Sequence, residues 1–290
     1  MSESDRVTPF FFESLPVRGA LVQLKNSWHR IQLNQHYEQP VLEVLGHAAA
    51  ASALIAQSLK FEGQITLQIT GKGPLSMLVM QCTSDLALRG MARAELSGAD
   101  MSYPDLMARA HCAITVDGED MERPYQGIVE VCGESLAQSL EHYYERSAQL
   151  PSHVVLIGEQ AVAGGLLLQR MPQGGELDED DWRRLGLLAA TLRAEELRDG
   201  AELALLAKLF AEDDLRVLES REVSFHCRCS QQRTEDVLRM LGVEEAEQAL
   251  GSRGRIDVTC EYCGRLRSFD EVDVKRLFAP PAGQASSRLH

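Results

Sequence analysis

Four cysteines near the C-terminus are the residues of this sequence whose types and spacing point most clearly to chemistry. They form two short pairs, Cys227-x-Cys229 and Cys260-x-x-Cys263, with thirty residues between Cys229 and Cys260. A tetrahedral Zn²⁺ ion is commonly held by two such chelating pairs from separate segments of the chain. The spacing therefore predicts one Zn²⁺ ion per chain, bound by Cys227, Cys229, Cys260 and Cys263.

The residues around the second pair favour a closed structural zinc site. Residues 255–259 predict a strand before Cys260, and Gly264 permits a tight turn that brings backbone N–H groups toward the sulfurs. A thioredoxin-like catalytic pair needs its first cysteine at a helix N-terminus, where the dipole lowers the thiol pKa. A hydrolytic zinc site keeps an open coordination position and a nearby general base. The sequence shows neither pattern, so catalysis by the cysteines is the weaker interpretation.

The same cysteines also allow a redox role. Zinc-bound thiolates react with peroxide, and each short pair can close into a local disulfide if the metal leaves. His226 is interpreted as a flanking residue, because four sulfurs already complete the zinc shell. Four arginines are candidates to offset the negative charge of the thiolates: Arg228, Arg255, Arg265 and Arg267.

The cysteine-bearing segment is too short to be stable by apolar packing alone. It spans about 50 residues, and bound zinc contributes folding energy of order 10 kcal/mol in such modules. A helix capped by Ser230 or Thr234 is expected between the pairs and is interrupted at Gly242, and Asp270 is expected to cap a last helix through Phe278. Three apolar side chains of the first helix are expected to face inward: Val237, Leu238 and Leu241.

The first 170 residues alternate between strand and helix patterns, and the strands outnumber the helices. We therefore predict an α+β fold in which an N-terminal α/β core has antiparallel-rich sheets packed on helices. Helices are expected at 40–60 and 135–149, and a hairpin at 71–74. Strands are expected at 19–24, 64–70, 75–82, 86–96, 110–116, 126–132, 153–157 and 162–170.

An acidic, leucine-rich segment follows a Pro/Gly break at 171–175. It predicts helix over 180–218, divided in two at Gly200, and its periodicity alone better fits two core helices of a larger domain. Acid clusters at 178–181 and 212–214 are expected to weaken its packing by repulsion. One apolar stripe comprises Trp182, Leu185, Ala189 and Leu192, and the other Leu203, Leu206 and Phe210.

These patterns divide the chain into four parts. We predict a core domain at 1–173, an acidic helical linker at 174–224, a zinc-binding domain at 225–280 and a flexible tail at 281–290.

Composition excludes several classes of partner. The net charge of −14 argues against general binding to nucleic acid or to anionic membranes. The N-terminus lacks a signal-peptide pattern, and the most apolar window, 45–59, is shorter than the roughly 20 residues of a membrane span, which predicts a cytoplasmic location. Gly71-Lys72-Gly73 lacks the spacing of a P-loop, so no bound nucleotide is predicted. The remaining cysteines, Cys82, Cys112 and Cys132, are expected to be small buried apolar residues.

At this point the sequence resembles the heat-shock protein 33 family of redox-regulated bacterial chaperones. The resemblance rests on residues 225–230 and 258–264, which carry the cysteine pairs, and on the thirty-residue gap between the pairs. It extends to Val17-Arg18-Gly19, to Leu45-Gly46 and to the turn at 71–75.

The resemblance implies an ATP-independent holdase, not an enzyme, that binds unfolding client proteins. It implies that the reduced, zinc-bound form is inactive, and that oxidation pairs Cys227 with Cys229 and Cys260 with Cys263. Zinc release, unfolding of the linker and homodimerisation would follow. A non-switching zinc-ribbon binding protein and a thiol-disulfide oxidoreductase are the alternative functions.

Overall fold

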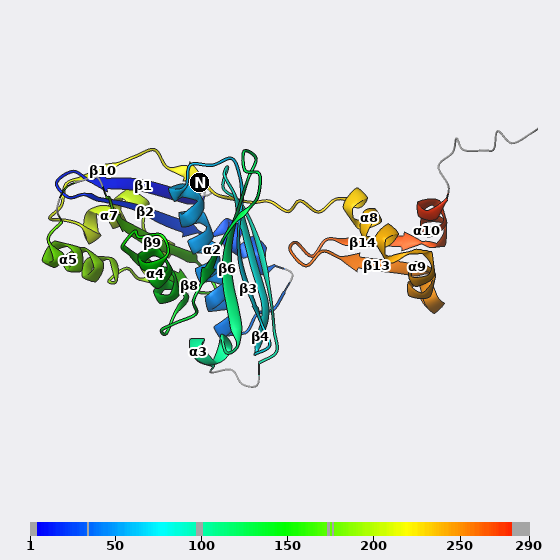
Figure 1. The fold of residues 1–290 in the computed structure, drawn as a ribbon. Coiled ribbons are helices and arrows are strands. Elements are labelled where there is room, and N and C mark those ends of the chain that lie inside the picture. The colour runs from blue at the N-terminus through cyan, green and yellow to red at the C-terminus, as the bar shows by residue number, and fades with distance from the viewer. Residues whose placement is uncertain (1–4, 34, 97–100, 173–174, 176, 280–290) are drawn as a thin grey trace, which may run out of the picture. The chain divides into compact units, whose positions relative to one another are not determined.

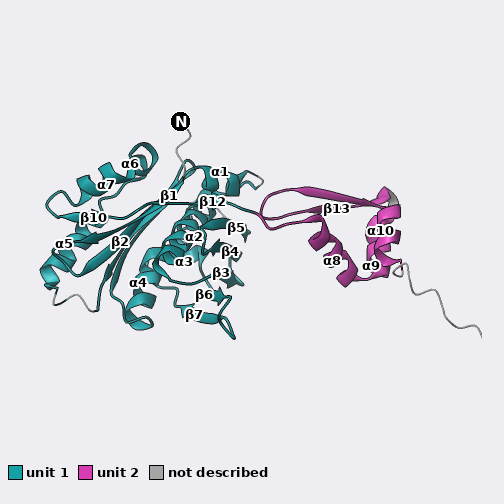
Figure 2. Ribbon diagram, turned by 90° about the horizontal axis from the view of Figure 1, so that it is seen from above, with its two compact units in different colours: residues 1–226 teal, residues 227–290 magenta. Residues whose placement is uncertain are grey.

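The structure is a computed structural model that describes residues 5–33, 35–96, 101–172, 175 and 177–279. The chain divides into two compact units, Met1–His226 and Cys227–His290 (Figure 2). The boundary predicted at 173/174 and the tail predicted at 281–290 fall outside the described residues. Each unit is therefore considered on its own.

The first unit contains two sheets, and the one nearest the N-terminus is wholly antiparallel. Its strand order is β10-β1-β2-β9-β8, with β11 also paired to β1. The strands are β1 (Arg6–Phe12), β2 (Val17–Leu24), β8 (Ser152–Gly158), β9 (Ala163–Arg170), β10 (Leu215–Val217) and β11 (Arg221–Glu222).

The second sheet has the order β12-β5-β4-β3-β6-β7, and every pair is antiparallel except β12 with β5. The hairpin predicted at 71–74 is confirmed, since it joins β3 to β4. The strands are β3 (Gly63–Gly71), β4 (Leu75–Thr83), β5 (Ala87–Ala94), β6 (Ala110–Gly118), β7 (Tyr125–Val129) and β12 (Ser224–Phe225).

The long helix α2 (Gln39–Ser58) lies between the two sheets (Figures 1 and 2). It is long and apolar enough to cross a membrane by length and composition, but 83% of its apolar window is buried inside the unit. Leu45, Ala49 and Ala53 are fully buried against both sheets, which makes α2 the centre of the core. The other helices on this side are α1 (Asn26–Gln32), α3 (Tyr103–Leu106) and α4 (Leu136–Arg146).

Three short helices cover the other face of the first sheet. They are α5 (Glu179–Ala189), α6 (Ala194–Asp199) and α7 (Glu202–Leu209), and their apolar side chains form a second buried cluster with that sheet. The Phe210 ring lies 6.0 Å from the Phe10 ring and 5.0 Å from the Phe12 ring, centre to centre. The fold class predicted from the sequence is confirmed.

Four details of the acidic segment differ from the prediction. There are three helices, because the chain also breaks after Ala189, and residues 215–217 form a strand on β1 instead of helix. Leu203 is exposed, so the second stripe runs through Leu206 and Phe210. Repulsion is also the wrong description of Asp213, whose carboxylate receives two 2.8 Å hydrogen bonds from Arg184.

The second unit is a two-stranded hairpin with three helices. Its small core contains Leu238, Ala246, Leu250, Ile256, Phe269 and Val274. Ser230 and Asp270 cap their helices as predicted, but Val237 and Leu241 are each 54% exposed, so the prediction that they face inward is wrong. The elements are α8 (Gln231–Leu241), α9 (Val243–Leu250), the 3-10 turn η1 (Gly251–Arg253), β13 (Arg255–Thr259), β14 (Leu266–Asp270) and α10 (Glu271–Phe278).

Candidate metal centre

The four predicted cysteines come together at one end of the second unit. Their sulfur atoms all lie within 4.8 Å of one another. The Cys227 and Cys260 sulfurs are 3.7 Å apart, and the Cys229 and Cys263 sulfurs are 3.4 Å apart. These separations are far longer than a disulfide bond, and all four thiols are free.

The arrangement fits a tetrahedral metal ion. A Zn–S bond is about 2.3 Å, so tetrahedral coordination places neighbouring sulfurs roughly 3.8 Å apart. The two sulfur separations given above, 3.7 and 3.4 Å, are close to this value, and four thiolate donors suit zinc. The donor set can therefore hold one metal ion in a closed shell.

The hairpin and the segment before α8 each supply one pair of sulfurs. Cys260 and Cys263 lie in the turn that joins β13 to β14, where the Cys260 N–H donates to the Arg265 carbonyl and the Gly264 N–H donates to the Cys260 carbonyl. Gly264 has a φ of +65°, a conformation that strains other residues. Cys227 and Cys229 lie in the extended stretch that leads into α8.

Backbone N–H groups approach the sulfurs, as the position of Gly264 predicted. The Arg265 N–H donates to the Cys263 sulfur, and the Cys229 N–H donates to the Cys227 sulfur. Such bonds favour the thiolate form of the cysteine that accepts them. The turn therefore orients the ligands and also stabilises their negative charge.

The four thiols are electrostatically unequal. Burial raises the pKa of Cys227 and raises the pKa of Cys263 to about 12. Burial also opposes ionisation of Cys229, but hydrogen bonds from Cys263 and Arg267 outweigh it and lower the pKa of Cys229 to about 7. The surroundings of Cys229 thus favour its thiolate form, whereas those of Cys227 and Cys263 oppose ionisation.

Of the four candidate arginines, the structure places Arg267 on a sulfur. Its Nη1 donates to the Cys229 sulfur over 3.6 Å. Arg255 instead donates to the Asp257 carboxylate at 3.0 Å, and the side chains of Arg228 and Arg265 are exposed. His226 is not one of the four clustered ligand residues.

No pattern in the sequence indicated a role for Arg233. Its Nη1 donates to the carbonyl oxygen of Arg228 at 2.8 Å, which fixes the backbone between the first two cysteines. Helical periodicity does not reveal this bond, because Arg228 lies before the helix begins.

The other three cysteines belong to the first unit. Cys82 and Cys112 are buried as predicted, and burial raises the pKa of each thiol to about 12. Cys132 is partly exposed, so the prediction of full burial is wrong for that residue.

Comparisons with known proteins agree on one family along nearly the whole chain. The family model described as Hsp33 protein matches residues 5–270. A 33 kDa chaperonin of Methylobacillus flagellatus is 42% identical over 282 residues, which is 96% of each chain. A 33 kDa chaperonin of Nitrosococcus oceani is 39% identical over 279 residues, again 96% of each chain.

A solved structure has a similar fold. The crystal structure of a 33 kDa chaperonin from Thermotoga maritima superimposes with a TM-score of 0.79, covering 94% of this chain and 97% of the other. The sequence identity is 21%, so this likeness concerns the fold alone.

Proposed function

Because the chain belongs to the Hsp33 protein family, we propose that this chaperone is an ATP-independent holdase that oxidation switches on. It is a chaperone and not an enzyme, in keeping with relatives that are named chaperonins. One observation carries the redox proposal. Four free thiols lie within 4.8 Å of one another in a unit that has a very small apolar core. A site of that kind makes the folding of the unit depend on the oxidation state of its sulfurs.

In the reduced state the four cysteines would hold one Zn²⁺ ion, and its chemical contribution would be folding energy. Peroxide would oxidise one thiolate of a pair to sulfenic acid, and the second thiol would displace water to form the disulfide. Each pair thereby loses two electrons, which reduce one peroxide molecule to two waters. Disulfide sulfurs are poor zinc ligands, so the ion would leave.

The expected disulfides are Cys227–Cys229 and Cys260–Cys263. This pairing rests on the family resemblance, whereas sulfur contacts of 3.7 and 3.4 Å join Cys227 to Cys260 and Cys229 to Cys263. Proteolysis of the oxidised chain followed by mass spectrometry distinguishes the two patterns. Crossed disulfides would contradict the local pairing and leave the metal ligands unchanged.

Clients would bind apolar surface that the reduced chain keeps covered. We propose that residues 174–224 act as a labile linker, and that its unfolding uncovers side chains such as Leu185, Leu206 and Phe210. All three are buried in the second core cluster. An oxidised homodimer and a cytoplasmic location belong to the same proposal.

The test follows zinc and client aggregation together. Peroxide is added to the reduced full-length chain under mildly unfolding conditions, and a chelating dye reports zinc while light scattering reports aggregation of an unfolded client. We expect zinc release to precede suppression of aggregation. Replacing Cys260 and Cys263 by serine should abolish zinc retention, whereas Cys132→Ser, a matched change outside the site, should alter neither readout.

Two outcomes would contradict the proposal. Zinc release without suppression of aggregation would indicate a non-switching zinc-ribbon binding protein. Catalytic turnover of a model disulfide would indicate a thiol-disulfide oxidoreductase, which the position of Cys260 after β13, away from any helix N-terminus, argues against.

A further inference from the structure

A cavity of about 330 Å³ opens at the surface of the first unit, between the C-terminal end of α2, helix α4 and the strands β6 and β7. Its walls are mostly apolar, with Ile55 from α2, Ile114 and Val116 from β6, and Tyr144 from α4. The volume is at the lower end of the range of small-molecule sites. Size and lining therefore fit a short apolar body and exclude a large polar ligand.

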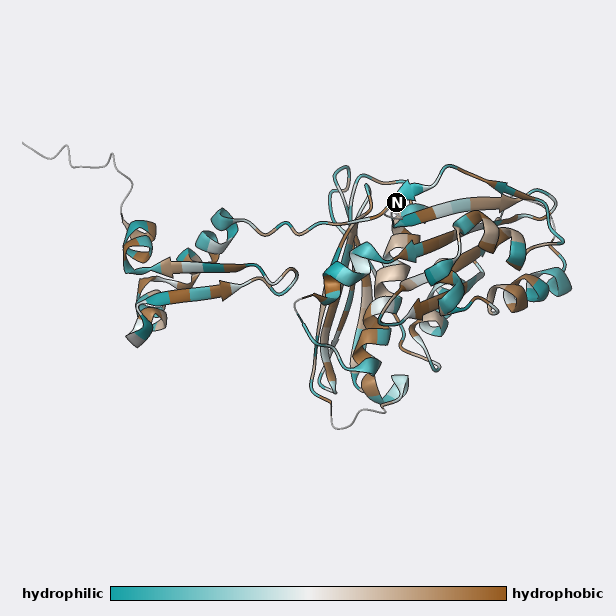
Figure 3. Ribbon diagram, turned by 180° about the vertical axis from the view of Figure 1, so that it is seen from behind, coloured by the Kyte–Doolittle hydropathy of each residue, from teal (hydrophilic) through white to brown (hydrophobic). Residues whose placement is uncertain are grey.

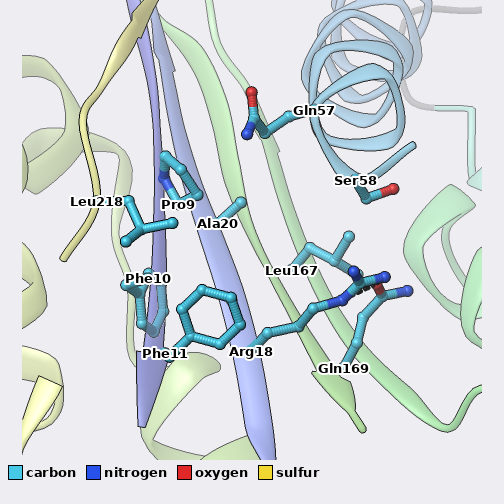
Figure 4. Close-up of a pocket in the computed structure, with 11 residues that line it drawn as sticks. Pro9, Phe10, Phe11, Arg18, Ala20, Gln57, Ser58, Leu167, Gln169 and Leu218 are labelled. Carbon is cyan, nitrogen blue, oxygen red and sulfur yellow. Dashed lines mark hydrogen bonds between the residues drawn. The ribbon is translucent and has the colours of Figure 1, made fainter. Parts of the chain in front are cut away.

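One charged group sits in the wall of this cavity without a charged partner. Arg18 donates from Nε and Nη2 to the side-chain oxygen of Gln169, at 3.2 and 2.8 Å (Figure 4). Gln169 is 2% exposed and is itself fixed by a 3.3 Å bond to the Ser152 hydroxyl. In the part of the chain that the structure describes, no carboxylate lies within ion-pair distance of Arg18.

This arrangement leaves the guanidinium ready for an anion. A neutral amide satisfies two of its five N–H donors, and Nη1 makes no hydrogen bond to a described residue. Gln169 holds the planar group in one orientation, which is the condition for bidentate binding of a carboxylate. Lys60 adds a second positive charge among the lining residues and is exposed.

Arg18 lies at the junction of two cavities. It also lines a smaller space of about 140 Å³, with Pro9, Phe11 and Ser58 (Figure 4). Burial raises the pKa of the Tyr144 phenol, and the positive charge of Arg18 partly offsets that effect, so the guanidinium acts electrostatically on the apolar cavity. The cation therefore marks one end of a pocket whose remaining walls are mostly apolar.

We propose that this cavity binds one aliphatic monocarboxylate of medium chain length, with its carboxylate on Arg18 and its tail against Ile114, Val116 and Tyr144. The planar, unneutralised guanidinium selects the head group, and the apolar walls select the tail. The site lies in the first unit and uses none of the cysteines. It is therefore independent of the proposed redox switch.

The test is calorimetric titration of the reduced, zinc-loaded full-length chain with decanoate, below its micellar concentration. We expect one molecule to bind per chain. Octanoate should bind more weakly by about fourfold for each methylene removed, because burying a methylene contributes about 0.8 kcal/mol. Decanol should bind at least tenfold more weakly than decanoate, because it cannot pair with Arg18.

The decisive variant is Arg18→Gln, and the chain offers a matched control. Arg89 donates to Gln81 across neighbouring strands at 2.8 Å, as Arg18 does to Gln169, but Arg89 does not line the cavity. Arg18→Gln should weaken decanoate binding at least tenfold and leave decanol binding unchanged. Arg89→Gln, which removes the same charge elsewhere, should change neither affinity.

The proposal fails if decanoate does not bind, if decanol binds equally well, or if Arg89→Gln weakens binding as much as Arg18→Gln. Circular dichroism establishes whether each variant is folded. Should Arg18→Gln unfold, methyl resonances of Ile114 and Val116 in the unaltered chain serve instead. Decanoate must shift these resonances, and shifts confined to other residues would overturn the assignment.

Discussion

The first unit buries a continuous apolar interior around α2, whereas the buried apolar core of the second unit amounts to six side chains in the described chain. Trp28, Phe10 and Phe210 are all fully buried in the first unit. Phe269 is the largest buried side chain of the second core. A domain of that size is marginal on apolar burial alone, so the comparison indicates that the second unit needs a ligand to fold.

The second unit also exposes apolar side chains on its small surface. The second unit leaves apolar side chains exposed on its helices, including Val237, Met240 and Val272, at 54%, 87% and 70%. In Figure 3, apolar residues concentrate in α2 and the strands beside it, while β13 and β14 alternate between apolar and polar stretches. The second unit thus has too few inward positions for the apolar residues it carries.

Metal removal should have the largest effect and should act on one unit. Under reducing conditions a strong zinc chelator should unfold residues 227–279 while α2 and its two sheets keep their structure. The reason is that bound zinc contributes of order 10 kcal/mol to folding of such small modules. Hydrogen exchange followed by mass spectrometry should show protection lost in α8, α9 and α10 and retained in α2.

Restoring zinc provides the control. Protection in the second unit should return when zinc is added to the reduced chain, and it should not return in the variant with serine at 260 and 263. Unchanged protection of α8 to α10 in the chelated chain would show that apolar packing suffices. It would contradict the inference that the second unit needs a ligand to fold.

A cavity in the second cluster of the first unit should have the next largest effect. Phe210→Ala removes a ring that contacts Phe10 and Phe12, and we expect a loss of about 3–5 kcal/mol in the unfolding free energy of the first unit. Leu203→Ala is the matched control, because Leu203 lies in the neighbouring helix α7 and is 61% exposed. It should change the unfolding free energy by less than about 0.5 kcal/mol.

Measurements on both units show whether the lost packing in the first unit affects the second. Phe210→Ala should leave zinc retention by the second unit unaltered. If denaturant unfolding showed loss of α5 to α7 before the two sheets, the predicted separation of residues 174–224 as a linker would gain support. A single transition for the whole first unit would contradict that separation.

Acid should weaken the first unit through His47. Burial lowers the pKa of His47 to about 4, against 6.5 for an unperturbed histidine, and its Nε2 lies 4.0 Å from the Glu43 carboxylate. The unfolded chain therefore takes up a proton as pH falls below about 6.5 while the folded chain does not. Stability should decline between pH 6.5 and 4 by up to about 3 kcal/mol, and be fully present above pH 6.5.

His47→Gln should remove most of this slope in chemical denaturation followed at several pH values. Burial also lowers the pKa of His153, so His153→Gln is the control and should remove a smaller part of the same slope. Acid would also protonate the cysteine thiolates and so release the proposed zinc ion from the second unit. Added zinc should thus protect the second unit against acid. It should not change how the stability of the first unit depends on pH.

The sequence predicted the features that depend on local spacing. Two cysteine pairs in a characteristic pattern indicated four ligands, and the structure brings their sulfurs together. Alternation indicated strands such as β3 and β4, and the 3.6-residue period indicated α2. Each of these signals lies within a short window of sequence.

Features set by distant segments left no such signal. Strand β10 has three residues and exists because Val217 pairs with Phe10. Strand β1 contains Pro9, which weakens a strand pattern, yet the Pro9 carbonyl accepts a hydrogen bond from the Leu218 N–H. Val237 was expected to face inward, but no element among described residues 227–279 covers it, and it is 54% exposed.

The partners of charged side chains are also set by segments that are distant in the sequence. Arg18 and Gln169 are 151 residues apart and meet only through the register of β2 with β9. Of the arginines near the cysteines, composition could not single out Arg267, because its bond to the Cys229 sulfur depends on how the β13–β14 hairpin meets the segment before α8. Pairing partners of charged side chains therefore required the folded structure.

The smallest predicted effect concerns the pair that replaced the expected repulsion in the acidic segment. Asp213→Asn should lower the unfolding free energy of the first unit by about 1–3 kcal/mol, because Asp213 is only 10% exposed and accepts two bonds from the Arg184 guanidinium. The control is Asp180→Asn. The Asp180 carboxylate lies 3.8 Å from the Arg183 guanidinium and both side chains are largely exposed, so this change should lower the unfolding free energy by under about 0.5 kcal/mol. Both variants are compared by urea denaturation at low salt and again at high salt. If the two losses were equal, or if added salt abolished the larger one, exposed charge alone would account for the pair and α5 would owe little of its position to Asp213.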